Sequence, residues 1–544
     1  MEKQSLITAE KIFCNGIFYS MNEAQQVWEA VAVKGQYILC AGSREEVFSW
    51  QDEHTEIIDL GGKAVIPGLI EGHLHLMQAG EVAAQVPCFW LPKDVILANV
   101  AARVRTLKPG QWIKSVFGWN NEVWEDTSYP SKEELDAVAP ENPVSLGRCD
   151  GHMIWVNSKA LEIAGITEET ENPQGGEIMR KKDGSILGCL SDNACTLVMG
   201  KIPPMSLQER EEALLCAQEE LFQWGITSVM AMCVTKEHME AIQSLYEKGK
   251  LKLRISCALG GLPGESDGGI CEEYYRTGPV IEAYDQHLNV RAIKYFADGS
   301  FGAQSGALYE DYSDRPGHRG KLNHTDEEME ALVEKAHKNG FQVITHAIGD
   351  CANQQILDAY EVVLKKDWNP DHRFRIEHFQ LVNEKMVKQT RDLGVLVGMQ
   401  AIHAPKSGSM ADRRIGTERA AWSYASGIPY RAGIKIIGGS DAPSSPGNPF
   451  WGIYAACTRK DEYGKPEGGW YAQNCIPLSA AVKSYTNWAA YGQFEEQIKG
   501  SVEARKLADF IVLDRDIFTC PTDEIKEIKV LRTVLGGETV YQSK

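Results

Sequence analysis

Residues 65–75 read VIPGLIEGHLH, an apolar run that ends in two histidines one residue apart, His73 and His75. Side chains alternate between the two faces of an extended strand, so both imidazoles face the same way, about 6 to 7 Å apart. Neutral imidazole is the commonest side-chain ligand of divalent metals, and the pair therefore indicates half of a metal site. Two histidines alone also fit the end of an ordinary buried strand.

Seven more apolar runs of strand length lie downstream, at residues 226–232, 253–259, 290–297, 341–347, 374–379, 395–400 and 434–438. Helical patterns separate them. In residues 325–338, Thr325 and Glu328 form a capping-box pattern and Asn339-Gly340 ends the helix. Eight strands with helices between them predict an α/β fold, a parallel (β/α)8 TIM barrel.

The barrel is expected over residues 67–495. Residues 1–66 and 496–544 contain short alternating segments between glycine-containing turns, which predict small antiparallel strands. We expect them to form one composite β-sandwich domain from both chain ends. Residues from about 80 to 205 are too long for one crossover, and their Gly, Pro and Trp content indicates an inserted subdomain over the barrel mouth.

The composition of the 544 residues is that of an ordinary globular protein, with 43% hydrophobic and 24% charged residues. A net charge of −19 opposes nucleic acid or an anionic membrane as a partner, because both are polyanions. The sequence contains neither a signal-peptide pattern nor an apolar run of the roughly 20 residues that span a bilayer. We therefore expect a cytoplasmic protein.

Barrel enzymes carry their chemistry at the carboxyl ends of the strands. Here those ends hold His73 and His75, Lys294 with Asp298, His346, Glu377-His378 and Ser440-Asp441. Each histidine alone fits a structural role as well as ligation. Together, four imidazoles, a lysine and a carboxylate at one barrel mouth favour a metal site.

Several motifs resemble the amidohydrolase superfamily and, within it, amidohydrolase family 3, the YtcJ-like group that includes N-substituted formamide deformylase. The resemblance runs almost end to end. It rests on P-G-x-I-x-x-H-x-H at 67–75, Lys294 to Gly306, His346-Ala347-Ile348-Gly349-Asp350, Arg375-Ile376-Glu377-His378, Gly439-Ser440-Asp441-Ala442-Pro443 and Lys506-Leu507-Ala508-Asp509.

The resemblance implies a TIM barrel of the metal-dependent hydrolase type that binds Zn²⁺ or another divalent metal, as one or two ions. The residues matching its ligands are His73, His75, His346, His378 and Asp441. In related members a lysine at the position of Lys294 is carboxylated and bridges two metals, and a desolvated lysine suits that reaction. The alternative is an unmodified Lys294 that pairs with Asp298 or with the substrate.

The implied activity is hydrolysis of a non-peptide carbon–nitrogen bond, N-formyl or N-acyl, by metal-activated water. Asp441 would take the proton of the water and pass it to the leaving nitrogen. His378 would combine ligation with transition-state support. His152, in the insert, would contact the substrate or its oxyanion, or else cap local structure.

The substrate stays open. Glu71, Gln304, Cys351 and Ala401 stand where the family commonly has Asp, Arg, Arg and Pro. A cyclic amide, a carbamate or an N-acyl amino acid would suit the same site, and a non-catalytic binding protein would suit the same fold. We expect a small-molecule substrate, and a homodimer is left open.

Tryptophans are frequent in the insert. Trp90, Trp119, Trp124 and Trp155 either form an aromatic lid or pack in a core.

Overall fold

The computed structural model describes residues 7–88, 91–121, 124–148, 153–173, 176–262 and 266–544. The chain divides into two compact units. The first consists of Met1–Ala79 and Ala217–Lys544, and the second of Gly80–Cys216.

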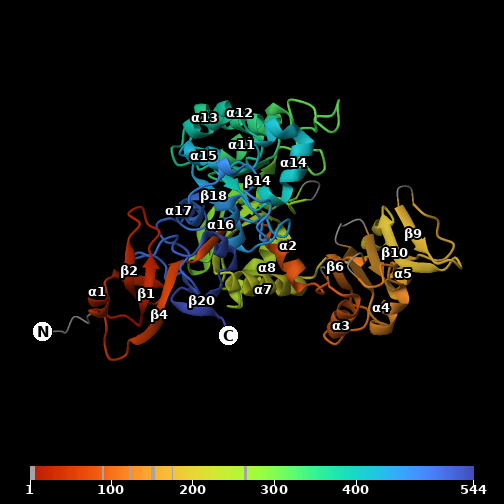
Figure 1. Cartoon of the computed structure of the whole chain (residues 1–544), viewed down its shortest axis with the longest axis horizontal. Coiled ribbons are helices and arrows are strands. Elements are labelled where there is room, and N and C mark those ends of the chain that lie inside the picture. The colour runs from red at the N-terminus through yellow and green to blue at the C-terminus, as the bar shows by residue number, and fades with distance from the viewer. Residues whose placement is uncertain (1–6, 89–90, 122–123, 149–152, 174–175, 263–265) are drawn as a thin grey trace. The chain divides into compact units, whose positions relative to one another are not determined.

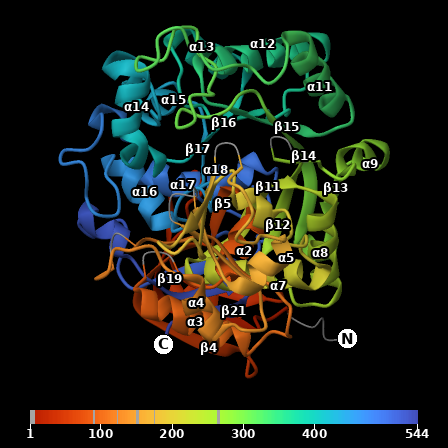
Figure 2. The same cartoon turned by 90° about the vertical axis from the view of Figure 1, so that its right-hand side faces the viewer.

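Eight parallel strands of the first unit form the predicted barrel, which confirms the fold class (Figure 2). They are β5 (Leu69–Leu74), β11 (Ile226–Val234), β12 (Arg254–Leu259), β14 (Leu288–Phe296), β15 (Gln342–Ala347), β16 (Arg375–His378), β17 (Leu396–Met399) and β18 (Ile436–Gly438). The gap between the first and last strands is bridged just beyond β18, where the Asp441 N–H donates to the His73 carbonyl at 2.8 Å and the His75 N–H donates to the Ala442 carbonyl at 3.0 Å. The closure therefore joins two of the predicted site segments directly.

Helices connect and cover the barrel strands. They are α2 (Leu76–Ala84), α7 (Leu207–Gln223), α8 (Lys236–Glu247), α9 (Ile270–Thr277), α10 (Ala283–Gln286), α11 (Asp326–Lys338), α12 (Asp350–Lys366), α13 (Glu384–Leu393), α14 (His403–Ala420), α15 (Gly427–Arg431), α16 (Pro449–Thr458), α17 (Leu478–Ser484) and α18 (Asn487–Gly492), with a short strand, β13 (Val280–Glu282), beside β14. Helix α11 begins at the predicted capping box, because Thr325 accepts from the Glu328 N–H and Glu328 accepts from the Thr325 N–H.

Both chain ends build one seven-stranded sheet, in which N-terminal strands lie beside C-terminal ones (Figure 1). Its strands are β1 (Lys11–Tyr19), β2 (Val27–Lys34), β3 (Tyr37–Gly42), β4 (Glu56–Pro67), β19 (Phe510–Leu513), β20 (Val530–Leu535) and β21 (Glu538–Gln542), with helix α1 (Arg44–Phe48) after β3. The expectation of antiparallel strands holds for every pair of this sheet except β1 and β4, which are parallel. The chain reaches β4 by way of β2, β3 and α1, so it can return in the direction of β1.

The second unit has its own five-stranded sheet, in the order β6-β7-β8-β10-β9. Its elements are α3 (Lys93–Val104), β6 (Ile113–Trp119), α4 (Lys132–Val138), β7 (Val144–Arg148), β8 (Met153–Val156), α5 (Ser158–Ala164), β9 (Gly176–Arg180), β10 (Ile186–Asp192) and α6 (Cys195–Met199). Trp119, Trp124 and Trp155 pack in its core, with ring centroids 5.9 to 6.4 Å apart. Core packing therefore accounts for these three rings, and Trp90 lies outside the described residues.

Over the part of the chain that the structure describes, no helix is both long and apolar enough to cross a bilayer.

Candidate metal centre

Three predicted ligands meet where the barrel closes. His73 and His75 lie at the end of β5, and Asp441 follows β18. The Nε2 atoms of both imidazoles lie 3.2 Å from the same Asp441 oxygen, Oδ1. The alternation of an extended strand thus brings the two rings together as predicted.

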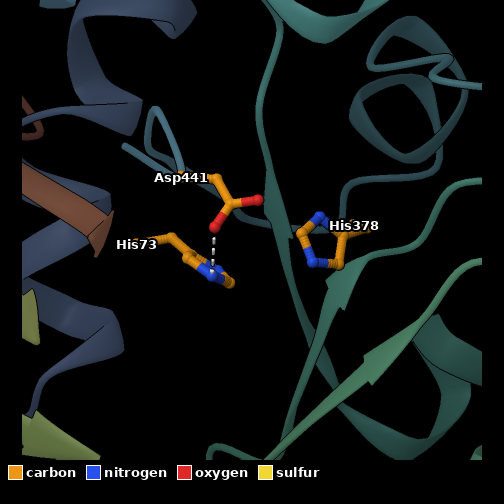
Figure 3. A group of neighbouring side chains, drawn as sticks. All are labelled: His73, His378 and Asp441. Atoms are coloured by element: carbon orange, nitrogen blue, oxygen red, sulfur yellow. Dashed lines mark ion pairs between the residues drawn. The ribbon is translucent and has the colours of Figure 1, made fainter. Parts of the chain in front are cut away.

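His378, at the end of β16, completes a compact group with His73 and Asp441. One ligand atom from each of the three residues lies within 4.8 Å of the others. The Asp441 carboxylate projects between the two imidazoles, which come from opposite sides (Figure 3). His378 Nδ1 contacts Gln400 Oε1 at 2.7 Å, which leaves its Nε2 for other contacts.

His346, in β15, lies next to this group. Its ring centroid is 4.6 Å from that of His378. Its Nε2 lies 3.0 Å from the Gly299 carbonyl oxygen. Burial and the nearby Lys294 charge lower the pKa of His346 to about 3, so the imidazole is neutral.

Lys294, in β14, is buried, with 3% of its surface exposed. Its Nζ makes no hydrogen bond within the described parts of the chain and lies 5.0 Å from the ring centroid of Phe296. Burial lowers the pKa of Lys294, although Glu377 opposes the shift.

Pairing of Lys294 with Asp298 does not occur in this structure. The carboxylate of Asp298 accepts instead from the backbone N–H groups of Ala307, Ile348 and Gly349 at 2.8 to 3.0 Å. His152, the remaining predicted site residue, lies outside the described residues.

Buried polar residues behind the imidazoles were not assigned from the sequence. Glu71 accepts from the backbone N–H groups of Ser440 and His73 at 2.8 and 3.1 Å and so ties β5 to the segment after β18. Burial raises the pKa of Glu71 to about 8. Glu377 lies 2.5 Å from His73 Nδ1. The sequence does carry a signal for these two residues, because each places a carboxylate inside an apolar strand, at positions 71 and 377. An unpaired charge there is costly, so a polar partner is expected.

His403, at the start of α14, was also not assigned. Its ring lies nearly parallel to that of His378, with centroids 6.4 Å apart. The sequence offers no strand-end signal for it, because it follows β17 by four residues.

Comparisons with known proteins identify the family of the chain. The model of the amidohydrolase family matches residues 56–541. The chain is 31% identical over 539 residues to the YtcJ protein of Bacillus subtilis, covering 98% of this chain and 99% of the relative. It is 28% identical over 527 residues to the N-substituted formamide deformylase of Arthrobacter pascens, covering 94% and 95%. The crystal structure of an uncharacterized metal-dependent hydrolase from Pyrococcus furiosus matches with a TM-score of 0.75 at 26% identity, covering 93% of this chain and 99% of the other.

Proposed function

The chain belongs to the amidohydrolase family, and from this membership we propose that it hydrolyses a non-peptide carbon–nitrogen bond, N-formyl or N-acyl, in a small molecule with the help of a divalent metal. The observation that carries the proposal is the approach of His73 Nε2 and His75 Nε2 to one Asp441 oxygen, each at 3.2 Å. Two imidazole nitrogens and a carboxylate oxygen that converge in this way form a donor set typical of a catalytic metal.

The buried donors at the barrel mouth fit such a metal. His73 Nε2 is buried without a hydrogen bond in the described structure, so its lone pair is available to an ion. We assign as ligands of Zn²⁺ or a similar ion the residues His73, His75, Lys294, His346, His378 and Asp441. When bound, the ion lowers the pKa of water towards neutrality and polarises a carbonyl oxygen.

Asp441 is assigned the proton transfers. Burial alone would raise the pKa of Asp441, but the neighbouring imidazoles of His73, His75 and His378 hold it well below its ordinary value. The carboxylate is therefore ionised and can accept a proton from the attacking water. It then delivers this proton to the leaving nitrogen, so that an amine departs.

His378 and His152 are assigned to the substrate. His378 lies beside the Asp441 carboxylate, and its proposed support of the transition state rests on the family resemblance. His152 is proposed as a second contact to the substrate or its oxyanion, on the family resemblance alone.

We assign Lys294 as the site of a carbamate. A neutral amine is required for attack on carbon dioxide, and burial lowers the pKa of Lys294 towards that state. The Nζ–C bond forms as one proton leaves, and the product carries two oxygens as ligands. An unmodified Nζ in active, metal-loaded protein, seen by mass and electron density, would contradict this assignment.

The test is turnover of a panel of N-formyl amines, N-acyl amines, N-acyl amino acids, cyclic amides and carbamates. Wild type should release amine from the first two classes. Asp441→Asn should lower kcat about 100- to 10,000-fold, the usual share of general acid–base catalysis. Asp392→Asn, a carboxylate paired with Lys388 on the surface of α13, is the matched control.

If the protein hydrolyses only N-acyl amino acids, cyclic amides or carbamates, the assigned substrate class changes but the reaction is still hydrolysis. Metal-loaded protein that hydrolyses none of the five would favour a binding protein on an amidohydrolase fold. Cytoplasmic location and homodimer formation stay predictions.

A further inference from the structure

The Nδ1 nitrogen of His73, which faces away from the Asp441 carboxylate, contacts the carboxylate of Glu377. His73 Nδ1 lies 2.5 Å from Glu377 Oε2, and 2% and 0% of the two side chains is exposed. Nε2 of the same ring faces Asp441 at 3.2 Å. One imidazole is thus placed between two carboxylates, one on each nitrogen.

The second oxygen of Glu377 is also occupied. Arg375 Nε donates to Glu377 Oε1, and Arg375 Nη2 donates to the Gly72 carbonyl oxygen at 2.7 Å. Since Gly72 precedes His73, Arg375 fixes both the carboxylate that contacts the His73 ring and the backbone that carries this ring. With both oxygens engaged, Glu377 is not available as a metal ligand itself.

The neighbouring strand leaves room for this carboxylate. Gly398 of β17 is in register with Glu377 of β16. A Cβ atom at position 398 would lie 2.1 Å from Glu377 Oε2. A residue larger than glycine would therefore displace the carboxylate from His73.

We infer that Glu377, clamped by Arg375, is a positioning residue that accepts the Nδ1 proton of His73 and so presents the unprotonated Nε2 to the metal centre, an inference that rests on the proposed function. A neutral imidazole carries its proton on one nitrogen only, and a carboxylate can only accept. Contact with Glu377 therefore selects the Nδ1–H form, and partners of this kind orient metal-binding histidines in general.

His378 provides an internal comparison. Its Nδ1 contacts the neutral amide oxygen of Gln400 at 2.7 Å. An amide can accept through oxygen or donate through nitrogen, so Gln400 selects a tautomer less strictly than Glu377 does. The variant Glu377→Gln would give His73 the same kind of partner.

The experiment compares metal-free wild type, Glu377→Gln and the control Glu496→Gln by ¹⁵N NMR of the histidine side chains, with His73→Ala assigning the His73 signal. Glu496 forms a bidentate pair with Arg373, two residues before Arg375, at 2.8 and 2.9 Å, and no hydrogen bond joins it to His73 in the described structure. Zinc affinity of the same proteins is measured by chelator competition.

Wild type and the Glu496 variant should both carry the His73 proton on Nδ1. In Glu377→Gln a fraction should move to Nε2, and zinc should bind about 10- to 100-fold more weakly. Glu377→Asp, which keeps the charge, should restore the Nδ1–H form at least in part. A purely structural role of the Arg375–Glu377 pair would lower stability without moving the proton.

An Nε2–H form in wild type would overturn the inference even if every variant failed to fold. An unchanged tautomer and zinc affinity in folded Glu377→Gln would overturn it as well. The tautomer is read without metal or turnover, so a protein that holds the proton on Nδ1 through Glu377 but hydrolyses nothing would contradict the proposed function alone.

Discussion

His378 and Asp441 both have left-handed backbone conformations, with φ of 70° and 61°. Such a conformation costs a non-glycine residue on the order of 1 to 3 kcal/mol and is concentrated at functional sites. In an ideal strand, the adjacent residues Glu377 and His378 would face opposite sides. Because His378 turns out of that pattern, its ring and the Glu377 carboxylate both reach His73. The unfavourable backbone conformation of His378 therefore allows two neighbouring side chains to reach the same imidazole.

His372 provides a pH-dependent contribution to stability outside the metal centre. Its Nδ1 accepts from the Phe374 N–H at 2.8 Å and its Nε2 donates to the Leu393 carbonyl at 2.9 Å, which requires the neutral ring. Burial lowers the pKa of His372 below its ordinary 6.5. The unfolded chain therefore binds the extra proton first, and this contribution is present above pH 6.5 and lost as the pH falls towards the folded-state pKa.

We predict that His372→Asn lowers the free energy of unfolding by about 1 to 3 kcal/mol at pH 7.5 and by less at pH 5.5. Urea titrations at the two pH values measure the difference. His54→Asn, at an exposed histidine, should show no such trend. A difference for His372 that is constant or grows in acid would contradict the assignment.

At the scale of elements, Asp298 joins the loop after β14 to the turn between β15 and α12. It accepts three backbone N–H groups, from Ala307, Ile348 and Gly349. We predict that Asp298→Ala lowers the free energy of unfolding of the metal-free protein by on the order of 3 kcal/mol, because buried N–H groups lose their acceptor. Thermal melting measures it. Asp314→Asn, at a partly exposed Arg414 pair in the same loop, should cost well under half as much, and equal losses would contradict the role of Asp298.

The elements that could be predicted are those whose pattern is local. The eight barrel strands and α11 follow from apolar runs and caps, and the strand-end residues His73, His75 and Asp441 meet because parallel strands end at one mouth. The contact of Glu377 with His73 could not be predicted in this way. It joins residues 304 positions apart and depends on the backbone turn at His378 and on the space at Gly398.

At the scale of the whole molecule, a buried ion pair joins the barrel to the sheet of the chain ends. Arg254, in β12, donates to both oxygens of Asp509 at 2.7 and 3.2 Å, just before β19. Removing one partner of such a pair leaves a buried charge and costs about 3 to 5 kcal/mol. We predict that Asp509→Leu lowers the free energy of unfolding by this amount, as measured by urea denaturation. Asp392→Leu, at the exposed pair with Lys388, should cost at most about 1 kcal/mol, and equal losses would contradict the prediction.

The second unit has a core of its own, so a substitution in that core should lower the stability of this unit and leave that of the first unit unchanged. Trp155 is fully buried and its Nε1 donates to the Ser131 carbonyl at 2.9 Å. Trp155→Ala should cost about 3 to 5 kcal/mol within this unit. Hydrogen exchange followed by mass spectrometry should show faster exchange in residues 80–216 and little change in the barrel strands. An equal rise in both units would contradict separate cores. Trp368→Ala, at a largely exposed ring of the first unit, is the control.

We predict that residues from several strands hold a divalent metal at the barrel mouth. The test is a metal analysis of three proteins: wild type, His73→Ala and Asp441→Asn. Each protein is purified and then dialysed against a zinc solution before its metal content is measured. Wild type should retain one or two equivalents and both variants should lose most of it, while His54→Ala, at an exposed histidine, should match wild type. Metal-free wild type, or variants that retain as much metal as wild type, would contradict the claim.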